Sequence, residues 1–322
     1  MLTLKEAVRQ SPQTAPLRGR AIELERIAGV LQRVRASGQG ELLVILGEPG
    51  IGKTALLKAT IAHNRVLGFS TGIGRAHERD QIAPMAPLLE ALRSGPTPLL
   101  SRPVFTDLAP LYSHQPWLVD GLTTAVEDMA VKSPLLIAID DVQWADQLSL
   151  FALRIVPSRL AGMPIVWVLS SRSRPRTAVS QLVDAVTPDV HVEVIELGPL
   201  MPEAVAELAR DRLGIPPNDQ LRKLLAGAAG SPFLTVELLD GLARGEGLGA
   251  GELPQSFVAS ALERLKSLSS VAVQFIKVGS ILGGTFSAAS LNPSASQPPF
   301  FNALERTAAR HRINLPWVRI PP

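Results

Sequence analysis

One short segment constrains this chain more than any other: Gly47 is followed by four residues and then by Gly52, Lys53 and Thr54. An apolar run at 42–46 precedes the segment and predicts a strand, and a helical pattern follows it. A strand, a glycine-rich turn and the start of a helix, in that order, are the context in which this spacing binds phosphate. The segment therefore predicts a phosphate loop inside an α/β arrangement.

Each residue type in the loop suits a polyphosphate ligand. Glycines allow backbone angles that point successive N–H groups inward, and the helix adds its unpaired N–H groups and positive dipole end. Lys53 is predicted to reach the β- and γ-phosphate oxygens, and Thr54 to offer its hydroxyl to Mg²⁺. The predicted phosphate-binding residues are Gly47, Glu48, Pro49, Gly50, Ile51, Gly52, Lys53, Thr54 and Ala55.

Strands and helices alternate along the first part of the chain. Wholly apolar runs such as 135–139 are typical of strands buried on both faces of a parallel sheet. Helices are predicted at 21–35, 53–63, 84–92, 117–130 and 147–160, and strands at 42–46, 66–74, 135–139, 165–171 and 190–197. A loop is predicted between the helix at 84–92 and Gln115. The alternation predicts a parallel P-loop NTPase sheet with helices on both faces.

Strand signals stop at Pro202, and the rest of the ordered pattern is helical. Helices are predicted at 202–213, 217–228, 232–243, 254–267 and 269–281, with a glycine-rich hinge at 245–251. We therefore expect a smaller all-helical lid domain after the sheet. The predicted division is an irregular N-terminus at 1–16, the α/β nucleotide-binding domain at 17–199, the lid at 200–285 and an irregular tail at 286–322.

Composition excludes several classes of protein. The chain has no cysteine, which excludes a disulfide scaffold and a cysteine-ligated metal site. No apolar run approaches the roughly 18 residues that a membrane span needs, and the start is not a signal peptide, so a cytoplasmic protein without membrane contact is expected. The net charge of +3 is too small to form an electrostatic footprint for DNA.

Two carboxylates, Asp140 and Asp141, follow the buried strand at 135–139. Ligands bind beyond the carboxyl ends of parallel strands, and two carboxylates there need a cation nearby. We predict that Asp140 holds Mg²⁺ and that Asp141 orients or activates the attacking water. The alternative is that one or both only cap the next turn. Asp146 is predicted to be the N-cap of the helix at 147–160.

Arg172 follows the strand at 165–171 and is predicted to sense the γ-phosphate or to stabilise charge during transfer. The alternative is a solvated loop arginine, because Arg174 and Arg176 lie in the same loop. The predicted catalytic residues are therefore Lys53, Asp141 and Arg172.

These motifs together resemble a known family. The marks are Arg18-Gly19-Arg20, the loop at 47–54, Gly74-Arg75-Ala76, the string from Asp140 to Asp146, Ser170-Ser171-Arg172 and Gly230-Ser231-Pro232-Phe233. From about residue 17 to 285 the chain resembles a STAND-type signalling ATPase of the AAA+ class. It is similar to the nucleotide-binding module of large LuxR-type (MalT-like) transcriptional regulators.

The resemblance implies further roles for individual residues. Gly19 and Arg20 would lie near the adenine and ribose, and Pro232 would contact the adenine from the lid. Each has a plainer alternative: Gly19 as a turn, Pro232 as the first residue of a helix, and Trp144 as core packing. The cofactors implied are ATP or ADP with Mg²⁺. ADP would hold the module closed, and ATP would open it for self-association.

The resemblance also implies an ATP-binding regulatory switch with slow hydrolysis, since Asp141 is shorter than the glutamate of fast AAA+ motors. Such regulators continue into a helical-repeat sensor and a DNA-binding domain. The sequence after residue 285 resembles neither of them. We therefore expect a truncated form that does not bind DNA alone. The alternatives are an AAA+ ATPase of the origin-recognition or loader kind, with Arg264 as its lid arginine, and a non-functional nucleotide-binding relic.

Overall fold

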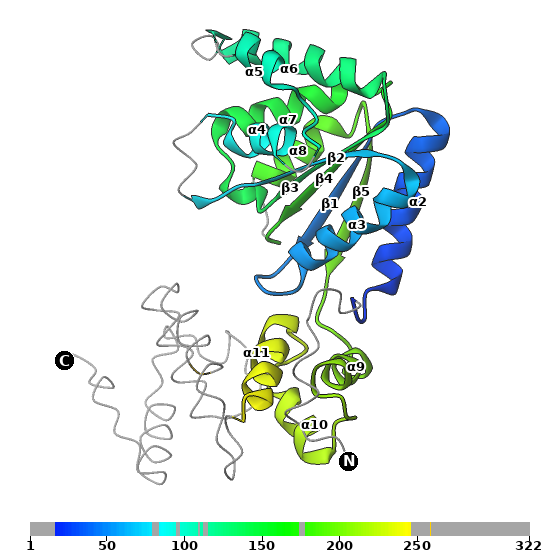
Figure 1. The fold of residues 1–322 in the computed structure, drawn as a ribbon, viewed down its shortest axis with the longest axis vertical. Helices are drawn as coiled ribbons and strands as arrows, with labels where there is room; N and C mark the ends of the chain where they lie inside the picture. The colour runs from blue at the N-terminus through cyan, green and yellow to red at the C-terminus, as the bar shows by residue number, and fades with distance from the viewer. Residues whose placement is uncertain are drawn as a thin grey trace, which may run out of the picture. The chain divides into compact units, whose positions relative to one another are not determined.

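The computed structural model describes residues 17–78, 84–94, 97–108, 110–111, 115–173, 178–245 and 258. Within them, parallel strands form one sheet in the order β2-β3-β4-β1-β5 (Figure 1). The strands are β1 (Glu41–Gly47), β2 (Ser70–Arg75), β3 (Leu135–Asp140), β4 (Ile165–Ser171) and β5 (His191–Leu197). The predicted parallel P-loop NTPase sheet is confirmed.

The central strands are apolar on both faces because both faces are covered by helices. Every residue of β3 and β4 is buried, as the unbroken apolar runs predicted. Side chains alternate along each strand, so Ile137 and Trp167 pack into one core and Ala138 and Val168 into the other. The sheet therefore separates two hydrophobic cores.

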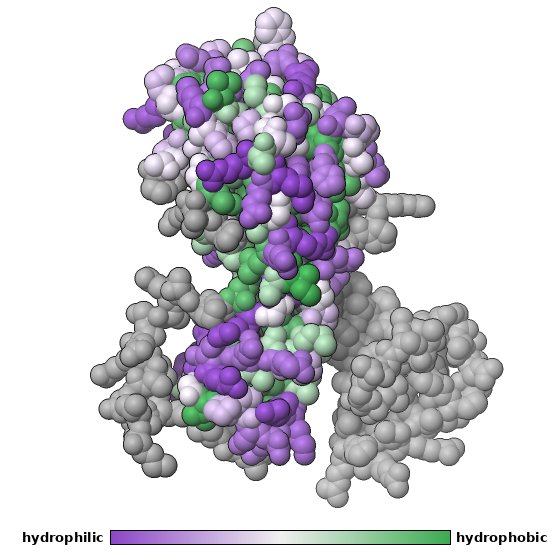
Figure 2. Space-filling model, turned by 90° about the vertical axis from the view of Figure 1, so that its right-hand side faces the viewer, coloured by the Kyte–Doolittle hydropathy of each residue, from purple (hydrophilic) through white to green (hydrophobic). Residues whose placement is uncertain are grey.

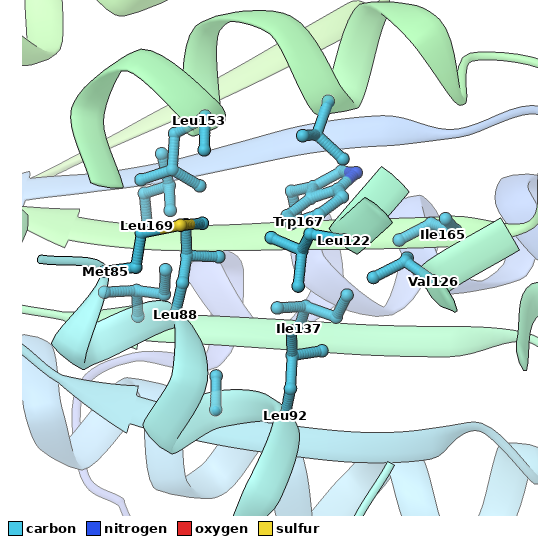
Figure 3. Close-up of a cluster of buried hydrophobic side chains, with 14 of the residues drawn as sticks. Met85, Leu88, Leu92, Leu122, Val126, Ile137, Leu153, Ile165, Trp167 and Leu169 are labelled. Carbon is cyan, nitrogen blue, oxygen red and sulfur yellow. The ribbon is translucent and has the colours of Figure 1, made fainter. Parts of the chain in front are cut away.

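Helices lie on both faces of the sheet, as Figure 1 shows. One core is formed with α2 (Ala21–Ser37) and α3 (Lys53–Leu67). The other is formed with α4 (Ala86–Arg93), α6 (Gln115–Ala130), α7 (Gln147–Arg159) and α8 (Ala178–Val186). In Figure 3 the indole of Trp167 lies among aliphatic side chains of this second core, including Leu122 and Ile137.

Three further helices follow the sheet: α9 (Pro202–Leu213), α10 (Asp219–Ala226) and α11 (Pro232–Ala243). They confirm the predicted helices at 202–213, 217–228 and 232–243. The described residues from 17 to 245 form one compact unit, and the predicted boundary at 199/200 stays a prediction. Leu200 donates its N–H to the carbonyl of Gly230, which ties the segment after β5 to the turn before α11.

Several predicted features lie outside the described residues. They are the irregular segments at 1–16 and 286–322, the helices at 254–267 and 269–281, Arg174, Arg176, Arg264, and the hinge at 245–251 apart from Gly245.

The structure differs from the sequence prediction in three places. The helix predicted to end at residue 63 continues to Leu67, so β2 begins at Ser70 rather than at residue 66. A helix, α5 (Arg102–Leu108), lies within the predicted loop, since proline near the first position of a helix is tolerated. Helix α8 was not predicted at all.

Among the residues that the structure describes, no helix is long and apolar enough to cross a membrane. Figure 2 shows much of one face of the described part in purple, with smaller hydrophobic patches between the polar residues.

Helix α4 packs very closely on β2, and two glycines allow this approach. A Cβ on Gly74 would lie 1.9 Å from the carbonyl oxygen of Pro87, and one on Gly72 would lie 2.2 Å from that of Ala91. Because the obstructing atoms are backbone, they cannot move without shifting the helix. We expect Gly74→Ala to lower the free energy of unfolding by about 3 kcal/mol.

Denaturant unfolding checks this expectation, with Gly162→Ala as the matched control, because a Cβ on Gly162 meets nothing within 4 Å. Equal unfolding midpoints for the two variants would contradict the close packing of α4 on β2.

Candidate nucleotide-binding site

The loop after β1 adopts the backbone conformation that its glycines allow. Gly50 has φ 78° and Gly52 has φ 104°, a region that residues with a Cβ rarely adopt. Helix α3 begins directly afterwards at Lys53, so its first N–H groups open onto the loop. The sequence prediction of strand, loop and helix is confirmed at this position.

Lys53 is the first residue of α3 and is 6% exposed. Its ammonium donates to the carbonyl oxygens of Gly47, at 2.7 Å, and Glu48, at 3.0 Å. Burial lowers the pKa of Lys53, and the charges of Asp141 and Asp140 oppose that shift. The loop thus holds a buried cation whose charge an anionic ligand would favour.

Asp140 ends β3 and is buried beside the start of α3. The Thr54 hydroxyl donates to its Oδ2 at 2.7 Å, and the Ser170 hydroxyl donates to its Oδ1. Both carboxylate oxygens therefore accept from side chains, and neither caps a turn. A threonine hydroxyl beside a carboxylate is the oxygen set that Mg²⁺ takes together with phosphates, so these residues fit the predicted metal.

Asp141 turns the chain away from the sheet with φ 58° and ψ 42°. It precedes the short 3-10 helix η3 (Val142–Trp144), but its side chain makes no capping bond there. Instead, Oδ2 pairs with Arg75 at 2.9 Å, and Oδ1 accepts from the Gln143 amide at 2.9 Å. The carboxylate therefore points toward the site, and the capping alternative is not what the structure shows.

Arg172 comes directly after β4 and contacts the same turn. Its guanidinium lies over the ring of Trp144, 5.2 Å from the centroid, and its backbone N–H donates to the Gln143 side chain at 3.2 Å. Its positive charge lowers the pKa of Lys53, in opposition to the two carboxylates. Arg172 and Lys53 also line the same cavity, so both can contact one ligand.

A cavity of about 460 Å³ opens over these residues, a size typical of small-molecule sites. Its walls come from the phosphate loop, Asp141, the residue after β4 and the start of α11. Its lining residues are Pro49, Gly50, Gly52, Lys53, Thr54, Ala55, Arg75, Asp141, Arg172, Pro232, Phe233 and Val236. Arg75, Phe233 and Val236 were not predicted as site residues, although Arg75 and Phe233 stand in the family motifs.

Helix α11 begins at the loop. The Phe233 N–H donates to the carbonyl of Gly50 at 3.1 Å, and Pro232 is the first residue of the helix. Pro232 also lines the cavity, so both of its predicted roles agree with its position. Its contact with adenine stays a prediction.

Gly19 and Arg20 are not among the residues that line the cavity, but Arg20 contacts the phosphate loop. The Arg20 guanidinium is 5% exposed and donates to the carbonyls of Ile51, at 3.1 Å, and Gly198, at 2.7 Å. Gly19 has φ 67°, and a Cβ there would lie 2.5 Å from the Cβ of Ala204. Arg20 thus braces the loop against the segment after β5, and the contact of both residues with adenine and ribose stays a prediction.

Asp146, the last residue of the acidic string, is the N-cap of α7, as predicted. Its Oδ1 accepts from the N–H groups of Ser149, at 2.9 Å, and Met85, at 3.0 Å. Met85 precedes α4 with φ 60°. Asp146 therefore fixes two helix starts at once, and its role in the string is structural.

Comparisons with known proteins agree with this geometry. Residues 16–168 match the family model described as AAA ATPase domain. That part of the chain is similar to an AAA ATPase domain. No curated protein matches the chain.

Two solved structures, the first two below, share the fold of this chain at low sequence identity. Aeropyrum pernix ORC2, in its ADPNP-ADP complexes, is 18% identical, with a TM-score of 0.55 over 95% of this chain and 84% of that one. Aeropyrum pernix ORC1 in complex with DNA is 14% identical, with a TM-score of 0.53 over 98% of this chain and 83% of that one. A STAND protein from Pyrococcus horikoshii is 18% identical, with a TM-score of 0.45, and this chain covers 34% of it.

The lowered pKa of Lys53 predicts a pH dependence of nucleotide binding. Phosphates favour the ammonium form, so binding raises this pKa again, and the complex takes up protons where free Lys53 is partly neutral. We therefore expect the affinity for ADP to fall as pH rises through the lowered pKa.

Calorimetry at alkaline pH in two buffers of different ionisation enthalpy should give different apparent enthalpies of ADP binding. In Lys53→Arg the difference should vanish, because a guanidinium does not deprotonate. Equal enthalpies for the unaltered chain would contradict this reasoning.

Proposed function

We propose that this chain is an ATP-binding switch that takes ATP or ADP with Mg²⁺ in the cavity above Lys53 and hydrolyses ATP slowly. One observation carries the proposal: the Thr54 hydroxyl lies 2.7 Å from Oδ2 of Asp140, so the loop and the acidic strand end meet as one oxygen set. Phosphate binding and metal binding by these residues would therefore occur at a single place.

The residues divide the work in a simple way. The loop N–H groups and Lys53 would hold the phosphates, and Thr54 and Asp140 would hold Mg²⁺, which would neutralise charge on the transferred phosphate. Asp141 would orient or activate water, and Arg172 would stabilise charge that develops on the γ-phosphate. The cavity lining supports this division, because loop, acid and arginine face the same space.

Slow turnover fits the surroundings of Asp141. Both oxygens of this carboxylate are engaged, one by the Arg75 guanidinium and one by the Gln143 amide. A base that is already paired accepts a proton less readily. This supports a switch, whose bound state must persist, over a motor that cycles fast. The role in a signal-responsive regulator rests on the sequence motifs from Arg18 to Phe233.

A loader of the origin-recognition kind is the second candidate, favoured by the fold that this chain shares with ORC2 over 95% of its length. ATP turnover of the purified chain, measured with and without duplex DNA, separates the two. The switch predicts turnover of about 10⁻² s⁻¹ or less, unchanged by DNA. Fast, DNA-stimulated turnover would support the loader. Binding of ATP or ADP with no detectable turnover would support the non-functional nucleotide-binding relic.

A further inference from the structure

The turn after β3 brings two side chains beside the end of β4. Strands β3 and β4 pair in parallel, with Ile139 opposite Leu169, so both chains leave the sheet at the same edge. The left-handed conformation of Asp141 then turns the chain into η3. As a result, Gln143 and Trp144 lie next to Arg172, although 28 or 29 positions separate them in sequence.

Gln143 joins the acidic residue to the arginine through one amide. Its Nε2 donates to Oδ1 of Asp141 at 2.9 Å, while its Oε1 accepts the Arg172 N–H at 3.2 Å. An amide can make both bonds because it carries a donor and an acceptor, whereas a carboxylate carries only acceptors. The two residues predicted to act on the γ-phosphate are therefore held at a fixed spacing.

Trp144 holds the other end of Arg172. Its ring is half-buried and packs against the core formed with α4, α6, α7 and α8, so the ring itself is fixed. The guanidinium lies 5.2 Å from the ring centroid, within the range of a cation–π contact. This contact keeps a long, rotatable side chain at the edge of the cavity.

We infer that Gln143 and Trp144 are positioning residues for recognition of the γ-phosphate: together they hold Asp141 and Arg172 as one unit. The inference rests on the proposed function and deepens it. Neither residue lines the cavity, so each acts through the carboxylate or the guanidinium that does. Binding of ATP should depend on this unit, whereas binding of ADP, which lacks the γ-phosphate, should not.

The test compares two dissociation constants in the full chain with Mg²⁺, one for ADP and one for a non-hydrolysable ATP analogue. Gln143→Glu keeps the size but removes the donor to Asp141, and Trp144→Ala removes the ring. In both variants we expect the analogue to bind about tenfold more weakly and ADP to bind within twofold of the unaltered chain. Trp144→Phe, which keeps an aromatic face, should recover most of the loss seen in Trp144→Ala.

Matched controls exclude a general effect of the substitutions. Gln147→Glu and Trp117→Ala make the same chemical changes at exposed positions outside the cavity, and the ratio of the two constants should stay unchanged in them. Unchanged ADP binding shows that each variant is folded.

The outcomes separate this inference from the proposed function. If the unaltered chain binds neither nucleotide, the proposed function fails. The decisive quantity is the dissociation constant for ADP divided by that for the ATP analogue. If the unaltered chain binds both nucleotides, and Arg172→Ala lowers this ratio while the Gln143 and Trp144 variants do not, only the positioning role is overturned. A ratio unchanged in Arg172→Ala overturns it as well, because the arginine would then have nothing to be positioned for.

Discussion

Replacing Lys53 by alanine is expected to abolish measurable binding of ATP and ADP. The ammonium is the cation of the loop, and it already lies 2.7 Å and 3.0 Å from two loop carbonyl oxygens. Hydrogen bonds to charged groups contribute about 1.5–3 kcal/mol each, so loss of contacts to phosphate should weaken binding at least about 100-fold. Calorimetry with either nucleotide and Mg²⁺ measures the effect.

The Lys53→Ala variant should still fold. Burial lowers the pKa of Lys53, which means that the folded protein disfavours this charge rather than depending on it. The melting temperature without nucleotide should therefore be unchanged or higher. Lys58→Ala is the matched control, since Lys58 is an exposed lysine on the same helix and should bind normally. Equal binding by Lys53→Ala would overturn the phosphate-loop interpretation.

Sequence predicted the parts of the site whose signals are local. The loop at 47–54 is read from its own spacing, and the carboxylates at 140 and 141 from their place after a buried apolar run. The rule that strand ends share one sheet edge then placed Thr54 near Asp140. The 2.7 Å contact between these two residues agrees with that reasoning.

The partners of those residues could not be predicted, because they depend on the order of the strands. Arg75 reaches Asp141 because β2 is the neighbour of β3, and Ser170 reaches Asp140 because β4 is its other neighbour. One sequence does not show which strands are neighbours. The Gly-Arg segment at the end of β2 and the Ser-Ser-Arg segment at the end of β4 were visible in the sequence, but only as marks of a family.

Helix α11 shows the same limit. The pattern at 232–243 predicted the helix with correct ends, yet nothing local indicated that the Phe233 N–H would bond to the carbonyl of Gly50. Arg20 is a second example, because its role depends on Gly198, far along the chain. Long-range hydrogen bonds of this kind follow from how elements pack, not from the pattern within each element.

Replacing Asp140 by asparagine is expected to uncouple nucleotide binding from Mg²⁺. The change keeps the shape and one acceptor for the Thr54 and Ser170 hydroxyls, but it removes the negative charge that would attract the metal. In the unaltered chain, chelation of Mg²⁺ should weaken ATP binding about tenfold. In Asp140→Asn the affinity should be the same with and without the metal, and turnover should fall about 100-fold.

The ratio of ATP affinities with Mg²⁺ and with a chelator is the decisive measurement, because partial unfolding lowers both affinities and leaves their ratio intact. Asp184→Asn serves as the matched control, since Asp184 is an exposed carboxylate on α8, outside the cavity, and should keep the full metal effect. A normal metal effect in Asp140→Asn would mean that Thr54 and phosphate oxygens suffice for Mg²⁺. The buried Asp140 would then act through its bonds to Thr54 and Ser170, as a support for the loop.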